Sequence, residues 1–379
     1  MPRSQPPRRT GRRSRGPPAC WRSSSKSRST ASPRARRRSS PWSPGRTVKR
    51  RRRTPLALGA YRECPLTFPG PESRNPTDPR ARTGRVTDQT TPHDPLDDPA
   101  APGAPVTAST RERVTGLDIR VDRAGFGPPV VVLNGLLGLN EHWFALLPHL
   151  IHRAEVFLVQ PPLLEMRGPA CSVDGVTRLI ASVVESLADQ PAVFVGNSLG
   201  GHVGLRLALD RPDLVRALAL VGSSGLFERG FEKGVEHSPS RQWLERKISE
   251  LFFDPARMWP SMIEDSYAEL SRRSSARALV KLGRSAKNDH LGERLGGVRV
   301  PTLLAWGRND IVTPPEVAVQ FSEMLPDARL RWIDRCGHAP QVEQPDELGR
   351  HLAEFLDELA RRDAGRLGGG RTGGGAVAG

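Results

Sequence analysis

The sequence predicts an α/β fold, in which helices cover both faces of a mostly parallel central sheet and one helical segment is inserted. From about Val114 onward, short apolar runs alternate with stretches of helical apolar spacing, which is typical of buried parallel strands and their crossover helices. The strongest signal is the apolar run 192–195, which leads through Gly196-Asn197-Ser198-Leu199-Gly200-Gly201 into a helical stretch. The third observation is that apolar residues keep a helical spacing, with no strand pattern between them, for about seventy residues, 227–295. This stretch is the predicted helical insertion.

Each expected element follows from its apolar pattern. Strands are expected at 117–121, 130–133, 156–159, 192–195, 218–221, 302–306 and 329–333. Helices are expected at 143–150, 174–187, after Ser198, at 315–324 and at 345–359, where apolar residues recur every three or four positions. The chain then divides into an α/β core of residues 106–226 and 296–363, a helical cap at 227–295 and a flexible Gly-rich tail at 364–379.

Residues 1–105 differ from the rest in composition. They hold 24 of the 57 Lys and Arg residues and 7 of the 41 Asp and Glu residues, a net charge of +17 against −1 for the remainder. Arg, Ser and Pro dominate, so the segment cannot bury enough apolar surface to offset its ordering entropy and is expected to be disordered. Three interpretations stay open: a basic tail that contacts nucleic acid or acidic surfaces, a transit-like leader, and untranslated sequence upstream of the true start.

The cysteines indicate neither a metal site nor a disulfide framework. Cys20, Cys64, Cys171 and Cys336 are widely separated, with no C-x-x-C spacing and no histidine pairing. A reducing compartment, and with it a cytoplasmic location, is therefore expected. No apolar run approaches the roughly 20 residues of a membrane-spanning helix, so a membrane span is not expected.

The turn around Ser198 has the pattern of a nucleophile elbow. A serine on a sharp strand-to-helix turn takes a strained backbone conformation with its hydroxyl pushed out of the sheet, and glycines two residues before and after relieve the crowding. The following helix directs its free N–H groups and positive dipole end at the same place. We therefore predict Ser198 as a nucleophile.

A serine hydroxyl needs a base, and the base needs a carboxylate to hold its tautomer. Asp310 follows the strand 302–306 and His338 follows the strand 329–333. Because parallel strands present their carboxyl ends at one edge of the sheet, both are expected near Ser198. Asp334 is a rival carboxylate, ranked lower because it lies only four residues before His338. The other histidines that we weighed are expected on the surface or in packing positions: His142, His149, His152, His202, His237 and His290.

A tetrahedral intermediate also needs N–H donors for its oxyanion. One is expected from the backbone of Leu199, directly after the nucleophile, and the other from Leu136 in the loop after the strand 130–133. Substrate contacts are expected from Gly135, Asn197 and Trp143, although core packing is an equally good interpretation of Trp143. No metal ligand is expected.

These motifs resemble those of the α/β-hydrolase superfamily over roughly 114–361. The elbow 196–201, together with a helical cap, is similar to a group of esterases and carbon–carbon bond hydrolases that includes the meta-cleavage product hydrolases. The resemblance implies Ser198 as nucleophile, Asp310 as acid, His338 as base and no cofactor. The chain departs from the family pattern in carrying Asn before Gly135 where His is usual, in lacking the His-Gly-x-Gly-Pro-Gly loop, and in carrying Ala339 where meta-cleavage hydrolases tend to have Trp.

The sequence thus predicts a serine hydrolase that cleaves an ester or related acyl bond of a small to medium apolar substrate. Two alternatives remain. One is a carbon–carbon bond hydrolase, and the other is a non-catalytic or nucleic-acid-binding protein that acts through residues 1–105. Nucleic acid is the less favoured partner, since the excess positive charge is confined to that segment. The oligomeric state stays open.

Overall fold

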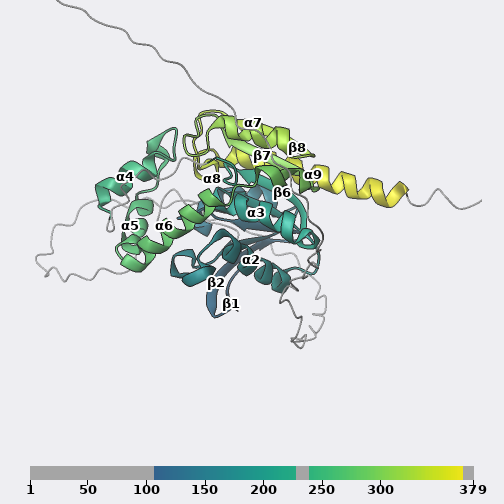
Figure 1. The fold of residues 1–379 in the computed structure, drawn as a ribbon. Coiled ribbons are helices and arrows are strands. Elements are labelled where there is room, and N and C mark those ends of the chain that lie inside the picture. The colour runs from purple at the N-terminus through teal and green to yellow at the C-terminus, as the bar shows by residue number, and fades with distance from the viewer. Residues whose placement is uncertain (1–105, 228–238, 370–379) are drawn as a thin grey trace, which may run out of the picture. The chain divides into compact units, whose positions relative to one another are not determined.

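The computed structural model describes residues 106–227 and 239–369 (Figure 1). These residues contain an eight-stranded sheet in the order β1-β2-β4-β3-β5-β6-β7-β8. The predicted disorder of residues 1–105 lies outside the described residues, as does the predicted tail from residue 370 onward. β2 pairs antiparallel with β1 and with β4, and the other neighbours are parallel. The strands are β1 (Ala108–Val114), β2 (Leu117–Gly125), β3 (Pro129–Leu133), β4 (Glu155–Gln160), β5 (Ala192–Asn197), β6 (Val215–Val221), β7 (Thr302–Gly307) and β8 (Ala328–Ile333).

All seven predicted strands are present, and the mostly parallel α/β fold is confirmed. The eighth strand, β1, was not predicted from the sequence. Its residues Ala-Ser-Thr-Arg-Glu-Arg-Val are exposed or half-exposed along their whole length, so no apolar alternation marks it. It forms by pairing with β2 at the sheet edge, where most of its side chains meet solvent and Val114 packs against the core.

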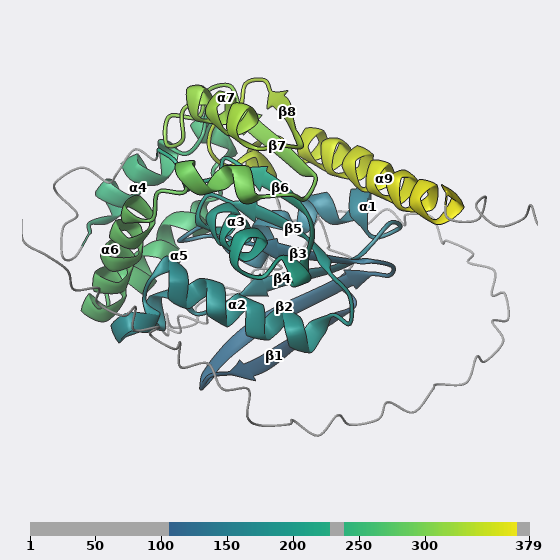
Figure 2. The same ribbon diagram turned by 45° about the vertical axis from the view of Figure 1, so that its right-hand side comes forward.

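Helices cover both faces of the sheet (Figure 2). In β5, Phe194 belongs to one apolar core while Val193 and Val195 belong to the other, as the two-residue repeat of a strand requires. The Phe194 side is packed by α2 (Val173–Leu187), α3 (Leu199–Asp210) and α7 (Pro315–Met324). The other side is packed by the 3₁₀ helix η2 (Asn140–Leu146), α1 (Leu147–Leu150) and α9 (Pro345–Gly369).

Two helices differ from expectation. The single helix predicted at 143–150 is a 3₁₀ segment, η2, that continues into the short α1. The predicted end of α9 near 359 is too early, because the helix runs to Gly369, inside the stretch predicted as a tail. Ion pairs hold its later turns to the sheet: Arg362 with Asp327 at 2.6 Å and Asp363 with Arg216 at 2.6 Å.

The segment between β6 and β7 is helical where it is described. We call residues 239–297 the β6–β7 insertion. It contains α4 (Arg241–Ser249), η6 (Pro255–Arg257), α5 (Pro260–Leu270), α6 (Arg273–Asn288) and η7 (Gly292–Gly297). Both ribbon views place α4, α5 and α6 together at one edge of the sheet. A backbone hydrogen bond of 2.7 Å from His338 N to Leu251 O shows that this edge includes the loop after β8.

Candidate active site

Ser198 occupies the turn between β5 and α3 in a strained conformation. Its φ of 51° and ψ of −116° lie in a region that side-chain-bearing residues rarely adopt. A Cβ atom on Gly196 would lie 2.4 Å from the Gly200 carbonyl carbon, and one on Gly200 would lie 2.3 Å from Leu133 O. The glycines are therefore required by backbone contacts, and the predicted elbow geometry is present.

Backbone hydrogen bonds hold the turn. Ser198 N donates to Val221 O at 3.1 Å, and Ser224 N donates to Ser198 O at 3.2 Å, so the end of β6 fixes the turn on both sides. The Ser198 side chain is 7 % exposed. Leu199 is the first residue of α3, and the amide groups of a helix's first turn lack partners within the helix. The turn thus places the backbone N–H groups of the first turn of α3 beside Ser198.

His338 and Asp310 form a buried pair at the neighbouring strand ends. Asp310 follows β7 and His338 follows β8, and His338 Nδ1 lies 2.8 Å from Asp310 Oδ2. The carboxylate is completely buried and also accepts hydrogen bonds from Val312 N, Thr313 N and Thr313 Oγ1, at 2.8, 2.9 and 2.8 Å. These donors fix the carboxylate, and a proton held on Nδ1 leaves Nε2 as the basic nitrogen of the imidazole.

The rival carboxylate is placed elsewhere. The Asp334 side chain is 76 % exposed and pairs with Arg308 Nε at 2.6 Å. It lies directly after the end of β8, on the surface of the turn that leads to His338. Of the two carboxylates considered from the sequence, the structure therefore brings Asp310 to His338.

Asn197 connects the elbow to the histidine loop. Its Nδ2 atom donates to Val221 O and to His338 O, both at 3.0 Å. Gly222 lies beside the His338–Asp310 pair: a Cβ atom there would be 3.0 Å from Asp310 Oδ2 and 3.2 Å from His338 Nδ1. The amide hydrogens of Asn197 are thus used within the protein, and its predicted contact with substrate stays a prediction.

The loop after β3 lies against the elbow. A Cβ atom on Gly135 would lie 3.4 Å from Ser198 Cβ and 3.2 Å from Asn197 Oδ1. Leu136 follows on this loop and is half-buried. The two backbone segments predicted to bind an oxyanion, at Leu136 and Leu199, are therefore neighbours of the same serine, as the register of β3 with β5 requires.

A buried polar network supports this loop, and it was not predicted from the sequence. Asn134 Oδ1 accepts a hydrogen bond from Trp143 Nε1 at 2.8 Å, and Asn134 Nδ2 donates to Asn140 Oδ1 at 3.0 Å. Asn140 in turn donates to Asp122 Oδ2 at 2.8 Å and to Leu158 O at 2.9 Å. Asn134, which stands where the family usually has His, thus closes a chain of hydrogen bonds from β2 to the loop.

Trp143 is joined to the loop after β3 by its hydrogen bond to Asn134. The indole is 2 % exposed and belongs to the apolar core on the α9 side of the sheet. This position agrees with the alternative of core packing. The predicted contact of Trp143 with substrate stays a prediction.

His142 is a second buried histidine near the loop. Its Nδ1 accepts a hydrogen bond from Leu139 N at 3.2 Å, and its ring meets that of Trp259, in the insertion, edge to face at 5.4 Å. Burial lowers its pKa from the ordinary 6.5 to about 4, so the ring is neutral at neutral pH. The side chain is therefore a packing residue between η2 and the insertion, as expected.

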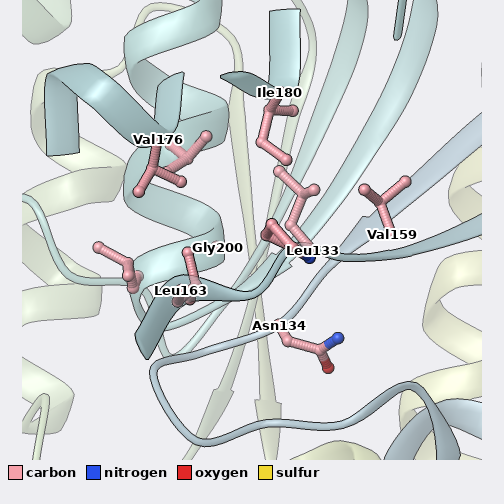
Figure 3. A pocket seen from close by; sticks show the side chains of 10 residues that line it. Leu133, Asn134, Val159, Leu163, Val176, Ile180 and Gly200 are labelled. Atoms are coloured by element: carbon pink, nitrogen blue, oxygen red, sulfur yellow. The ribbon is translucent and has the colours of Figure 1, made fainter. Parts of the chain in front are cut away.

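A small hollow opens beside the elbow (Figure 3). Leu133, Asn134 and Gly200 line one side of it, and most of the remaining lining is aliphatic. Its other residues come from the end of β4, from η3 (Leu163–Glu165), from α2 and from α3: Val159, Pro161, Leu163, Val176, Ile180, Leu199 and Val203. Apolar side chains therefore lie beside Leu199, one of the two predicted oxyanion donors.

The described residues hold no cluster of three or more His, Cys, Asp or Glu side chains that could bind a metal ion. Among the helices of the same ranges, none combines the length and apolar character needed to cross a bilayer.

A glycine-flanked serine on a strand-to-helix turn, next to a histidine–aspartate pair at the carboxyl edge of a parallel sheet, is typical of α/β-fold hydrolases. Comparison with known proteins agrees, because the sequence model of the alpha/beta hydrolase family matches residues 130–350. The chain belongs to this family and is a hydrolase.

Three of the proteins to which the chain is similar illustrate the comparison. Over 246 residues the chain is 30% identical to the pimeloyl-[acyl-carrier protein] methyl ester esterase of Nitrosomonas europaea, a match covering 61% of this chain and 96% of the relative. Over 194 residues it is 28% identical to the 2-hydroxy-6-oxononadienedioate/2-hydroxy-6-oxononatrienedioate hydrolase of Comamonas testosteroni, covering 47% of this chain and 67% of the relative. Among solved structures, it is similar to MGS-MChE2, an alpha/beta hydrolase enzyme from a sediment metagenome of the Mar Chica lagoon, Morocco. The TM-score is 0.53 at 28% identity, and the match covers 66% of this chain and 98% of that one.

Proposed function

We propose that this protein is a serine hydrolase that cleaves an ester or related acyl bond through an acyl-enzyme. The observation that carries the proposal is the 2.8 Å contact between His338 Nδ1 and Asp310 Oδ2, next to a serine on a strained, glycine-flanked turn. An aspartate that accepts three further hydrogen bonds is held as an anion and keeps the imidazole in one tautomer. Ser198 is the nucleophile, His338 the base and Asp310 the orienting acid.

In acylation, Ser198 Oγ attacks the carbonyl carbon of the substrate while His338 Nε2 takes the hydroxyl proton. The imidazolium is stabilised by Asp310, and it returns the proton to the leaving alcohol when the tetrahedral intermediate collapses. Water then attacks the acyl-enzyme, with its proton taken by the same nitrogen, and a carboxylic acid leaves as Ser198 recovers its proton. No metal or organic cofactor takes part in these steps.

The negative oxygen of each tetrahedral intermediate is bound by the backbone N–H groups of Leu136 and Leu199. The close approach of Gly135 to Ser198 and the start of α3 at Leu199 support this assignment. Donors that are fixed before the reaction stabilise the developing charge without reorganising, and each is worth about 10²–10³ in rate.

The substrate is a small to medium acyl compound with an apolar acyl group. The aromatic side chains that the insertion carries, among them Trp243, Phe252 and Trp259, support an apolar partner. The β6–β7 insertion acts as a cap over the substrate, as the 2.7 Å bond between His338 N and Leu251 O supports. The relative in Nitrosomonas europaea is named as an esterase, and the match covers nearly the whole length of that relative. We therefore favour carboxylic esters as substrates.

Fluorophosphonate labelling and turnover of activated esters test the proposal. Wild-type protein is expected to label at one serine and to hydrolyse p-nitrophenyl esters. Ser198→Ala removes both activities while thermal unfolding shows the fold intact. Ser322→Ala, at a half-exposed serine of α7 whose hydroxyl donates to Val319 O at 2.7 Å, is the matched control and labels as the wild type does. Labelling of the Ser198→Ala variant would refute the assignment of the nucleophile.

Carbon–carbon bond hydrolysis of a vinylogous diketone is the second candidate. The similarity to a 2-hydroxy-6-oxononadienedioate/2-hydroxy-6-oxononatrienedioate hydrolase favours it. The absence of the His-Gly-x-Gly-Pro-Gly loop and the presence of Ala339 count against it. A ring-cleavage dienoate and a series of simple esters, compared by kcat/KM, separate the two, and a preference for the dienoate would replace the ester proposal.

A cytoplasmic location is part of the proposal. It is supported by Cys171 and Cys336, which are free and buried. Recovery of the native protein in the soluble cytosolic fraction, by immunodetection, checks it; recovery in an exported or organellar fraction would contradict it.

A further inference from the structure

Glu343 is a buried carboxylate that takes no part in the acylation and deacylation steps proposed above. It ends the short helix α8 (Pro340–Glu343), five residues after His338, and is 1 % exposed. Its Oε2 atom accepts hydrogen bonds from Gly337 N at 2.7 Å and from Phe253 N at 3.1 Å, and its Oε1 atom accepts one from Asp254 N at 2.7 Å. One side chain thus binds three backbone amides from two separate segments.

The two segments are the histidine loop and the β6–β7 insertion. Gly337 directly precedes His338, while Phe253 and Asp254 follow α4 in the insertion. The segments also touch directly: His338 N donates to Leu251 O at 2.7 Å, and a Cβ atom on Gly337 would lie 2.5 Å from Leu251 O. The Glu343 carboxylate therefore binds a junction where the backbone of the predicted base meets the insertion.

The chemistry of the junction selects a carboxylate. Three N–H groups point at one side chain, and a carboxylate is the acceptor with two oxygens and no hydrogen of its own. A glutamine would direct its NH₂ group at one of the three donors. Across residues 106–227 and 239–369 no salt bridge joins Glu343 to Lys or Arg, so the cost of burying the charge is met mainly by these backbone donors.

We propose that Glu343 is a positioning residue: it holds the backbone of the His338 loop against the insertion, so that the orientation of the imidazole and the seating of the insertion are set together. This inference rests on the proposed function, because it concerns the reach of His338 to Ser198. Displacing a reacting group by about 1 Å costs about 10²-fold in rate, so a loosened loop has a large effect without any change in the triad itself.

Two variants of Glu343 remove different numbers of its three hydrogen bonds. Glu343→Ala removes all three acceptors, and kcat/KM for p-nitrophenyl butyrate is expected to fall by about 10- to 100-fold. Glu343→Gln keeps one oxygen for Gly337 N and Phe253 N and loses the bond to Asp254 N. Its activity is expected to fall by about fivefold to tenfold, less than in Glu343→Ala, because only one of the three charge-assisted hydrogen bonds is lost.

The matched control is Leu352→Ala, which destabilises the α9 side of the core at a residue 2 % exposed and away from the junction. Activities are compared under conditions where thermal unfolding shows every variant folded. A second measurement separates positioning from general destabilisation. It is the downfield NMR resonance of the His338 Nδ1 proton bound to Asp310, which is assigned by its absence in Asp310→Asn and which general destabilisation leaves unchanged. It is expected to broaden or vanish in Glu343→Ala and to persist in Leu352→Ala and Glu343→Gln.

The outcomes separate this inference from the function beneath it. Wild-type protein that neither labels with a fluorophosphonate nor turns over esters overturns the proposed function. An active wild type with a folded Glu343→Ala variant that keeps full kcat/KM overturns the positioning role. So does a resonance that is unchanged in Glu343→Ala, or an equal loss of activity in a Leu352→Ala variant of matched stability.

Discussion

Replacing Trp143 by phenylalanine removes one hydrogen bond from beneath the loop after β3, the loop proposed to bind the oxyanion, while keeping an aromatic ring in the core. The lost bond is the 2.8 Å contact from the indole Nε1 to Asn134 Oδ1. Because Asn134 is 8 % exposed, its oxygen is left without that donor in a buried place, at a cost of about 1–3 kcal/mol. The midpoint of thermal unfolding is expected to fall by about 2–4 °C for each kcal/mol.

Activity is expected to fall together with stability, because Asn134 immediately precedes the loop that carries Gly135 and Leu136. Loss of a whole oxyanion donor costs about 10²–10³ in kcat, so a loosened donor is expected to cost about tenfold. The fall appears in kcat and is the same for p-nitrophenyl esters of different acyl length, since the indole acts through Asn134. Trp332→Phe, at a half-buried tryptophan of β8, is the control and leaves both quantities near wild type.

A double-mutant cycle with Asn134→Ala gives the decisive measurement. If Trp143 acts through its bond to Asn134, then Trp143→Phe adds little to the loss already caused by Asn134→Ala. Additive losses, or a change in KM that depends on acyl length, would refute this reasoning and would favour direct contact between Trp143 and the substrate.

Three further predictions follow from the same geometry. Asp310→Asn is expected to lower kcat by about 10³–10⁴ by presenting an amide N–H to His338 Nδ1, as steady-state ester hydrolysis by a folded variant will show; a loss below tenfold would contradict the orienting role. For His142, whose pKa is lowered from 6.5 to about 4, the unfolded state binds the proton first, so this contribution to stability is complete above pH 6.5 and is lost as the pH falls toward 4. This contribution amounts to about 3 kcal/mol. The free energy of unfolding, measured by chemical denaturation at each pH, is expected to depend less steeply on pH in His142→Phe; an unchanged dependence would exclude the histidine as the source of the effect. Gly200→Ala places a Cβ atom 2.3 Å from a backbone oxygen and is expected to prevent stable folding, whereas Gly283→Ala in α6 meets nothing within 4 Å and is expected to stabilise by about 0.5–1 kcal/mol; thermal unfolding of both variants tests the contrast, which fails if they behave alike.

Sequence alone was sufficient where local pattern and a general rule of parallel sheets act together. Ser198, Asp310 and His338 could be assigned to one edge because each follows an apolar strand and such strands end on the same side. The glycines around Ser198 could be read in the same way, since crowding at a sharp turn is a local property. The strand β1 escaped prediction because its polar residues carry no periodic signal of an edge strand.

Contacts between distant segments could not be obtained in this way. Glu343 is an ordinary polar position in the sequence, and nothing near it indicates that it will bind Phe253 and Asp254 of the insertion. Asn134 was recognised as a departure from the family pattern, but its bonds to Trp143 and Asn140 depend on how η2 packs under the loop. Periodicity describes which face of an element is apolar; it carries no information on which buried polar groups will meet.

The sequence by itself therefore determined the class of fold, the elbow and the order of the predicted nucleophile, acid and base, because all of these follow from short apolar runs and the turns that end them. Only the tertiary structure decided that Asp310 rather than Asp334 reaches the imidazole, that Asn134 anchors the loop after β3, and that a buried carboxylate joins the histidine loop to the insertion. The physical reason is that hydrogen-bond partners are chosen by three-dimensional packing, where a few tenths of an ångström decide which donor is satisfied.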